Sequence, residues 1–231
     1  MNRTPLVLLP GLLCDARLWR DQLAGLDDLA QGLVADLTLD DSVEAMATRL
    51  LAQAPERFAL AALSMGGYVA FELLRQAPER VTRLALLATS AAPDSAERAR
   101  QRRAAMASMK LGRFMGVTDR MLPQLIHPDR VASEVGQEVR EMAARVGADA
   151  FLRQQTAILG RPDSRSLLAG IEVPTLVAVG DADQLTPPPE AQEIHAGIAG
   201  SRLHVFDRCG HLPPMELPGE TTAVLRDWLL A

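Results

Sequence analysis

Short apolar segments alternate with longer stretches of helical periodicity along most of this chain. The short segments consist mainly of Leu, Val and Ala, as do strands that are buried on both faces of a parallel sheet. The longer stretches repeat apolar residues at three- and four-residue spacing, which is typical of amphipathic helices. This alternation predicts an α/β fold with a mostly parallel sheet and helices on both faces. The six predicted strands span residues 5–9, 33–37, 58–63, 84–88, 174–180 and 202–206.

The predicted helices carry recognisable start and stop signals. Asp15 and Ser42 precede the first two helices and can cap their amino termini. Pro78 ends a helix predicted over residues 65–76, because proline cannot continue the hydrogen-bonding pattern. Two later helices are predicted, one after the prolines at 187–189 and one over residues 218–230.

The alternation of strands and helices stops between residues 93 and 170. This segment is rich in Ala, Arg, Met and Glu at helical spacing and contains no convincing strand. A chain of 231 residues is long enough for one substantial core. We therefore expect residues 1–92 and 171–231 to form one α/β core, and residues 93–170 to form an inserted helical cap.

The charge and composition of the chain argue against nucleic acid as a partner. The formal net charge is −5, so a phosphate backbone would repel much of the surface. Aromatic residues make up only 3% of the chain, which leaves few platforms on which bases could stack. A small molecule is the expected partner, and the sequence leaves open whether the protein is a monomer or a homodimer.

Two apolar stretches of the sequence could be mistaken for a membrane segment or a leader. The apolar stretch over residues 58–71 is too short to span a bilayer and is broken by two glycines. The first apolar run is interrupted by Pro10 and Gly11, and bulky Leu13 stands where a leader cleavage site needs a small residue. These features predict a cytoplasmic protein without membrane association.

The two cysteines show no pattern of metal ligation. Cys14 and Cys209 lie far apart in the sequence and belong to no Cys/His cluster with ligand spacing. We interpret both as small buried apolar residues. No metal ion and no organic cofactor are predicted.

Ser64 occupies the junction between a predicted strand and a predicted helix, in "ALSMGG". A nucleophile elbow places its serine in such a turn and needs small residues two positions before and after it. Gly66 meets this requirement, whereas Ala62 stands where the motif usually has glycine. The alternative is that Ser64 only caps the helix, as serines often do.

A nucleophilic serine needs a base, and His211 is the best placed of the four histidines. It directly follows the last predicted strand, at the sheet edge where Ser64 should emerge. An acid that orients the imidazole could be Asp181 or Asp183, which both follow the fifth strand, with Asp94 as an outside candidate. Packing, surface or lining roles are expected for the other histidines, which are His127, His195 and His204.

Two backbone N–H groups at the same sheet edge could form an oxyanion hole. Met65 follows the serine and supplies the first of them. Leu12 lies in the loop after the first strand, where Gly11 allows close approach of the backbone, and is predicted to supply the second.

Taken together, these motifs resemble the α/β-hydrolase superfamily with a helical cap, over essentially the whole chain. The order Ser, Asp, His matches that family, as do "GDADQLTP", similar to GxxDxxTP, and "GHLPPMELP", similar to GHxPxxExP. The resemblance implies that Asp183, rather than Asp181, is the acid. "LLPGLLCDARLW" resembles the family's oxyanion loop, with Pro10 in place of a histidine. The resemblance also implies that the first strand of this chain corresponds to the family's third strand, which leaves six strands.

The resemblance implies a serine hydrolase that cleaves a small ester or thioester through an acyl-enzyme. Acyl transfer to another acceptor and carbon–carbon bond cleavage remain alternatives, because the fold does not dictate the reaction. A non-catalytic binding protein with a decayed site is an alternative of another class. Pro10 and Ala62 are its only support.

The cap is expected to determine substrate specificity. Its arginines, Arg98, Arg102, Arg103 and Arg113, could attract an anionic substrate or carrier, but a solvated helix face is the more common use of such a run. Packing within the cap is the more common use of apolar residues in such a segment, but some of them could line an acyl pocket. The candidates for that pocket are Leu13, Met106, Met109, Phe114, Met115, Met121, Phe151 and Leu212.

Overall fold

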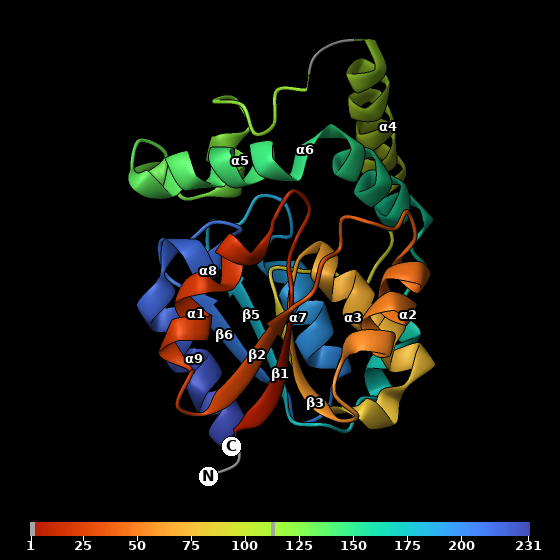
Figure 1. Cartoon of the computed structure of the whole chain (residues 1–231), viewed down its shortest axis with the longest axis vertical. Coiled ribbons are helices and arrows are strands. Elements are labelled where there is room, and N and C mark those ends of the chain that lie inside the picture. The colour runs from red at the N-terminus through yellow and green to blue at the C-terminus, as the bar shows by residue number, and fades with distance from the viewer. Residues whose placement is uncertain (1–2, 112–113) are drawn as a thin grey trace.

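The computed structural model describes residues 3–111 and 114–231. Six parallel strands form one twisted sheet in the order β2-β1-β3-β4-β5-β6, with helices on both faces (Figure 1). The sheet is therefore fully parallel, and the predicted fold class is confirmed. The strands are β1 (Thr4–Leu9), β2 (Ala30–Val34), β3 (Phe58–Leu63), β4 (Val81–Leu87), β5 (Thr175–Gly180) and β6 (Arg202–Phe206).

The helices of the core alternate with these strands. The loop after β1 leads into a 3₁₀ turn, Ala16–Trp19, whose amino end is capped by the side chain of Asp15. Ser42 caps the next long helix, where its hydroxyl accepts a hydrogen bond from the N–H of Ala45, as predicted. The core helices are α1 (Arg20–Gly25), α2 (Val43–Gln53), α3 (Met65–Gln76), α7 (Pro188–Gly197), α8 (Pro213–Glu216) and α9 (Pro218–Leu230).

Side chains that alternate along the strands build two hydrophobic layers. In β1, Leu6 and Leu8 face one layer, together with helices α1 and α9, while Val7 and Leu9 face the other, together with α2 and α3. Because neighbouring residues of a strand point to opposite faces, a continuous apolar run buries both sides of the sheet. All six residues of β3 are buried, which places the strand before Ser64 at the centre of the molecule.

The second strand differs from the prediction. The sequence predicts a strand over residues 33–37, but the strand that pairs with β1 is Ala30–Val34, with Thr4 opposite Ala30 and Leu8 opposite Val34. β2 lies at the edge of the sheet and is largely exposed, so it does not require a continuous apolar run. Leu37 is buried in the layer beneath α2 without belonging to a strand.

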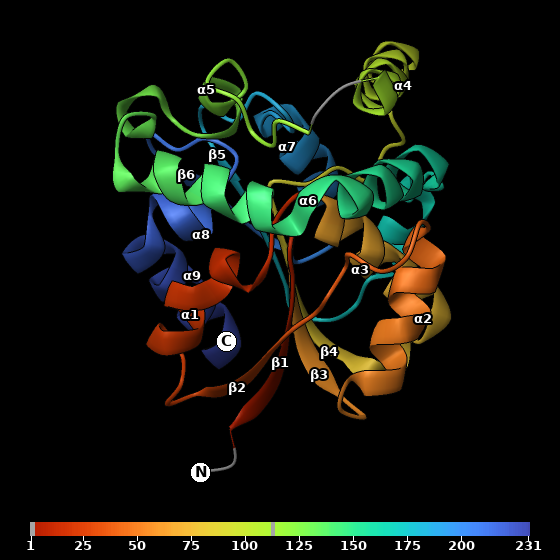
Figure 2. The same cartoon turned by 45° about the horizontal axis from the view of Figure 1, so that its top comes forward.

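Helices between residues 96 and 160 lie above the edge of the sheet where the strands end (Figures 1 and 2). This segment holds α4 (Ala96–Leu111), α5 (Leu122–Leu125) and α6 (Glu134–Gly160), and no strand is seen in its described residues. Gly147, at φ 81°, divides α6 into two helical parts. The assignment of residues 93–170 as a separate cap domain stays a prediction.

The buried side chain of Gln154 ties α6 to the core. Its Oε1 accepts a hydrogen bond from the N–H of Leu13 at 3.0 Å, and its Nε2 donates to the carbonyl of Leu37 at 3.1 Å. The donor, the N–H of Leu13, belongs to the loop after β1, and the acceptor, the carbonyl of Leu37, belongs to the loop after β2. One amide thus satisfies buried backbone groups of two loops from above.

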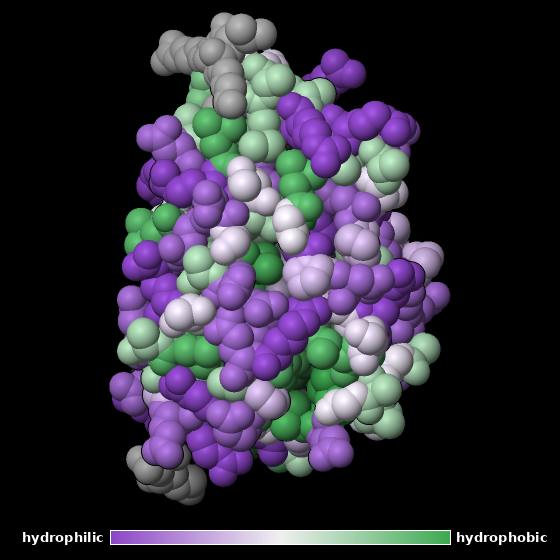
Figure 3. Space-filling model, turned by 90° about the vertical axis from the view of Figure 1, so that its right-hand side faces the viewer, coloured by the Kyte–Doolittle hydropathy of each residue, from purple (hydrophilic) through white to green (hydrophobic). Residues whose placement is uncertain are grey.

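The molecular surface combines hydrophilic and apolar areas. The face that includes α2 and α4 is mainly hydrophilic, with smaller apolar areas between the charged side chains (Figure 3). Among the described residues, no helix combines the length and the apolar character needed to cross a membrane.

A close approach between α3 and β1 makes Gly66 irreplaceable. A Cβ atom at Gly66 would lie 2.6 Å from the carbonyl oxygen of Leu9, which is backbone and cannot move aside. Overpacking of this kind typically costs about 1–3 kcal/mol, so we expect Gly66→Ala to lower the free energy of unfolding by that amount in urea denaturation. Gly219→Ala in α9 is the control, because nothing lies within 4 Å of its Cβ position. Equal stability of the two variants would contradict the close packing.

Candidate active site

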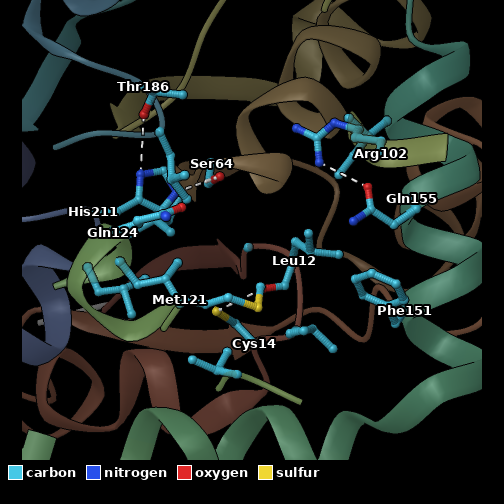
Figure 4. Close-up of a pocket in the computed structure, with 18 of the residues that line it drawn as sticks. Leu12, Cys14, Ser64, Arg102, Met121, Gln124, Phe151, Gln155, Thr186 and His211 are labelled. Atoms are coloured by element: carbon cyan, nitrogen blue, oxygen red, sulfur yellow. Dashed lines mark hydrogen bonds between the residues drawn. The ribbon is translucent and has the colours of Figure 1, made fainter. Parts of the chain in front are cut away.

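Three side chains form a hydrogen-bonded row where β3, β5 and β6 end. Nε2 of His211 lies 2.8 Å from Oγ of Ser64, and Nδ1 of His211 lies 2.8 Å from Oδ2 of Asp183. Ser64 and His211 lie together on one side of a cavity, with Thr186 next to them (Figure 4). The ends of parallel strands meet at one edge of a sheet, which explains how residues up to 147 positions apart converge.

Ser64 is held in a strained turn. Its φ of 53° and ψ of −115° are unusual for a residue with a side chain, and its hydroxyl makes no capping hydrogen bond to α3. Two neighbours fix the backbone, since the N–H of Ser64 donates to the carbonyl of Leu87 at 3.0 Å and Thr89 Oγ1 donates to the carbonyl of Ser64 at 2.7 Å. The hydroxyl is therefore available to His211.

Asp183 sits in a buried pocket of donors. Its Oδ1 accepts hydrogen bonds from the N–H groups of Leu185 and Thr186, and its Oδ2 accepts one from the Thr186 hydroxyl at 2.9 Å. Burial acts to raise the pKa of Asp183, but the neighbouring His211 and these backbone donors outweigh it and hold the pKa below its usual value. The carboxylate thus stays charged beside the imidazole.

Asp181 has a different position. Its Oδ1 accepts a hydrogen bond from the N–H of Cys209 at 3.0 Å. Burial acts to raise the pKa of Asp181, but hydrogen bonds from this N–H and from other backbone donors outweigh it and keep the pKa low. Asp94 lies elsewhere, between the guanidinium groups of Arg102 and Arg161. Of the three aspartates considered from the sequence, only Asp183 contacts His211.

Glu216 organises the loop that carries His211, a role that sequence reasoning missed. Its carboxylate is fully buried and accepts hydrogen bonds from the N–H groups of Gly210 and Leu212, on either side of His211. It also accepts one from the N–H of His127, in the segment between α5 and α6, at 2.7 Å. A glutamate flanked by apolar residues and prolines in "HLPPMELP" was the signal that could have revealed it.

The two predicted oxyanion donors lie at the same edge of the sheet. Met65 begins α3 directly after Ser64. The loop after β1 runs beside this turn, since a Cβ atom at Gly11 would lie 3.4 Å from Cβ of Ser64. In that loop the N–H of Leu13 is bound by Gln154, whereas Leu12 lines the cavity.

A cavity of roughly 390 Å³ opens above Ser64, between the sheet edge and the helices over it. This volume lies in the range of small-molecule sites. Its wall is largely apolar, with Leu13, Met121, Phe151 and Leu212 present as predicted. Further apolar lining residues are Val117, Leu125, Val139, Met142 and Ile158.

Three predicted pocket residues do not line this cavity. Met115 is 70% exposed, Met106 is half-buried on α4, and Phe114 packs against Phe151 with the ring centroids 6.0 Å apart. Phe114 and Met115 lie in no helix, so the helical spacing expected for this segment does not apply to them, and for Met106 the spacing could not show which face of α4 looks into the cavity. The side chain of Met109 and the whole of Arg113 lie outside the described residues.

The remaining histidines and the cysteines serve other purposes. His195 contacts Ser201, His204 contacts Glu220, and Nδ1 of His127 accepts from the N–H of Asp129. Both cysteines are buried and unpaired, and burial raises the pKa of Cys14 to about 12, so its thiol stays protonated. Within residues 3–111 and 114–231, no three His, Cys, Asp or Glu side chains cluster as metal ligands would.

Comparison with known proteins gives the same fold and a consistent chemistry. A pimeloyl-[acyl-carrier protein] methyl ester esterase from Neisseria meningitidis serogroup C is 30% identical over 196 residues, which cover 81% of this chain and 75% of that protein. The corresponding enzyme from Nitrosomonas europaea is 28% identical over 236 residues, or 94% of this chain and 92% of its own.

Solved structures agree with these relatives. A thermophilic esterase from Thermogutta terrifontis, bound to malate, superimposes with a TM-score of 0.86 at 31% identity and covers 98% of this chain and 89% of its own. An enol-lactonase from Burkholderia xenovorans gives a TM-score of 0.85 at 25% identity, with 100% and 93% covered. Residues 6–224 match the family described as the alpha/beta hydrolase family. This chain therefore belongs to the alpha/beta hydrolase family.

Proposed function

We propose that Ser64, His211 and Asp183 are the catalytic triad of a serine esterase that acts through an acyl-enzyme. The observation that carries this proposal is the row of two 2.8 Å hydrogen bonds that joins the three side chains at the floor of the cavity. Such a row combines a nucleophile, a base and a group that orients the base.

In the first half of the reaction, Nε2 of His211 accepts the Ser64 proton while Oγ attacks the ester carbonyl carbon. Nδ1–H of His211 donates to Asp183 throughout, which fixes the tautomer and stabilises the imidazolium. The imidazolium then returns the proton to the departing alcohol oxygen, and the acyl group remains bound to Oγ.

In the second half, His211 accepts a proton from a water molecule that attacks the acyl-enzyme. The carboxylic acid leaves, and the proton returns to Oγ of Ser64. In both halves the carbonyl oxygen becomes negative and needs donors that are already in place. We assign this role to the N–H groups of Leu12 and Met65, which lie at the cavity and at the positive end of α3.

The reaction class is ester hydrolysis, and the chain is an ester-hydrolysing enzyme of its family. Several of its relatives are named as methyl ester esterases of an acyl group on a carrier protein. We extend only the methyl ester chemistry to this chain. The apolar walls of the cavity suit an acyl chain of several carbons, and a small alcohol group needs little further space.

A decayed binding site is not favoured. Ala62, the departure that first hinted at decay, is fully buried in β3 opposite Leu9 and Leu86, and the turn at Ser64 still has its strained conformation. Pro10 comes directly before Gly11, and Gly11 still allows the loop to pass close to Ser64.

Removing the nucleophile should abolish turnover without unfolding the protein. We expect Ser64→Ala to lower kcat for a p-nitrophenyl ester by a factor on the order of 10⁴ or more. A fluorophosphonate should label the wild-type protein at Ser64 and leave this variant unlabelled, as mass spectrometry of the intact protein would show. Substantial activity in the variant would refute the assignment.

The two aspartates of the turn after β5 provide a matched pair. Asp183→Asn should lower kcat by a factor on the order of 10⁴, because the amide cannot hold His211 in the required tautomer. Asp181→Asn should leave kcat within about threefold of wild type, since it contacts only backbone N–H groups of its surroundings. Steady-state kinetics at constant pH decide the matter, and the reverse result would move the acid by two residues.

Glu216 should act as a positioning residue. Glu216→Gln removes the charge and turns an amide N–H₂ toward backbone donors, so the loop around His211 should shift and kcat should fall about tenfold at an unchanged KM. Glu220→Gln, an exposed glutamate on α9, is the control. The rate of fluorophosphonate labelling should fall in parallel with kcat in folded Glu216→Gln protein. An unchanged labelling rate would show that Glu216 serves stability alone.

A further inference from the structure

Opposite the triad, the cavity has a polar wall that ester cleavage does not explain. It is formed by Tyr68 of α3, Arg98 and Arg102 of α4, and Gln155 of α6. In the close-up, Arg102 and Gln155 lie on the other side of the cavity from Ser64 and His211 (Figure 4). A neutral ester would have no use for such groups, because its chain is apolar beyond the carbonyl.

The charges behind this wall do not balance. Asp94 is shared between two guanidinium groups, with Oδ2 2.6 Å from Nε of Arg102 and Oδ1 2.9 Å from Nη2 of Arg161. Glu190 pairs with Arg98 at 2.7 Å. Three arginines therefore face two carboxylates, and one positive charge is left over. Burial opposes ionisation of Asp94, but the two arginines outweigh it and keep its pKa low, so this count holds at neutral pH.

Hydrogen-bond donors on the wall are also left over. Nη1 of Arg102 donates to Oε1 of Gln155 at 2.9 Å, and Nε is bound by Asp94. Neither Nη2 of Arg102 nor Nε2 of Gln155 donates to any residue in the described ranges, and both residues line the cavity. The hydroxyl of Tyr68 adds a third donor to the wall. The guanidinium carbon of Arg161 lies 4.1 Å from the centroid of the Tyr68 ring.

On the basis of the esterase function proposed above, we propose that this wall binds a carboxylate, and that the enzyme prefers esters that carry a second, free carboxylate group. Arg102 and Gln155 bind the carboxylate, with Tyr68 beside them. One surplus positive charge matches a singly charged carboxylate better than a doubly charged phosphate. The apolar residues of the remaining wall accommodate the methylene chain between the carboxylate and the ester.

The test compares charged and neutral esters of equal length. Monomethyl adipate and methyl hexanoate share the methyl ester and a six-carbon acyl chain, and differ in the terminal carboxylate. The wild-type enzyme should show a kcat/KM at least about tenfold higher for the half-ester, because a charge-assisted hydrogen bond is made only to the carboxylate. Monomethyl esters of succinate, glutarate and pimelate then define the spacing, and hexanoyl glycolate tests a carboxylate on the alcohol side.

Variants of Arg102 assign the preference to the wall. Arg102→Gln should lower kcat/KM for the preferred half-ester by about 10–100-fold and change that for methyl hexanoate by less than about threefold. Arg102→Lys keeps the charge and should retain part of the preference. Arg103→Gln is the matched control, since Arg103 is the next residue on α4 and is exposed.

Binding is measured apart from turnover. Adipate should bind to the Ser64→Ala protein in isothermal titration calorimetry, and the Arg102→Gln substitution added to it should weaken that binding. This result does not require an active esterase, so it separates the wall from the triad. The proposal is overturned if the wild-type enzyme hydrolyses both esters equally well, if Arg102→Gln lowers both rates equally, or if adipate binds independently of Arg102. Loss of Ser64 dependence would instead refute the esterase function.

Discussion

The hydrogen bond between Nε2 of His211 and Oγ of Ser64 is the contact around which the rest of the molecule is arranged. It joins residues that are 147 positions apart, one after the central strand β3 and one after the edge strand β6, at 2.8 Å. No local preference could bring these atoms together. They meet because β3 and β6 run in the same direction in one sheet, and because a short turn follows each strand. The geometry of a parallel sheet is therefore the main precondition of the chemistry.

Each partner in this contact is restrained by buried backbone interactions. Ser64 keeps a positive φ because Leu87 and Thr89 hold its N–H and carbonyl groups. His211 keeps its position because Glu216 binds the N–H groups on both sides of it, and its own N–H donates to the carbonyl of Leu125. Local strain persists only where the surroundings over-determine it. Such restraints leave little reorganisation for the reaction itself.

The sequence predicted the parts of the fold that depend on periodicity and strand order. The sheet, the helices and the pairing of Ser64 with His211 follow from apolar runs and from residues placed directly after strands. The choice between Asp181 and Asp183 did not follow, because both lie in one turn and only its detailed path turns one side chain toward Cys209 and the other toward His211. Edge strand β2 was misplaced, since an exposed strand lacks the apolar signal. The cap residues were the least predictable. Met115 and Phe151 are both large apolar residues of the same segment, and only tertiary packing exposes the first and places the second at the cavity.

Gln154 connects the roof of the cavity to its floor. A single side chain of α6 holds Leu13, next to the assigned oxyanion donor Leu12, and also Leu37 in a neighbouring loop. Grafting a foreign roof onto this sheet would thus remove a support of the catalytic floor, even if every residue around Ser64 were kept. Chimeras between relatives should exchange the helix together with both loops that it anchors.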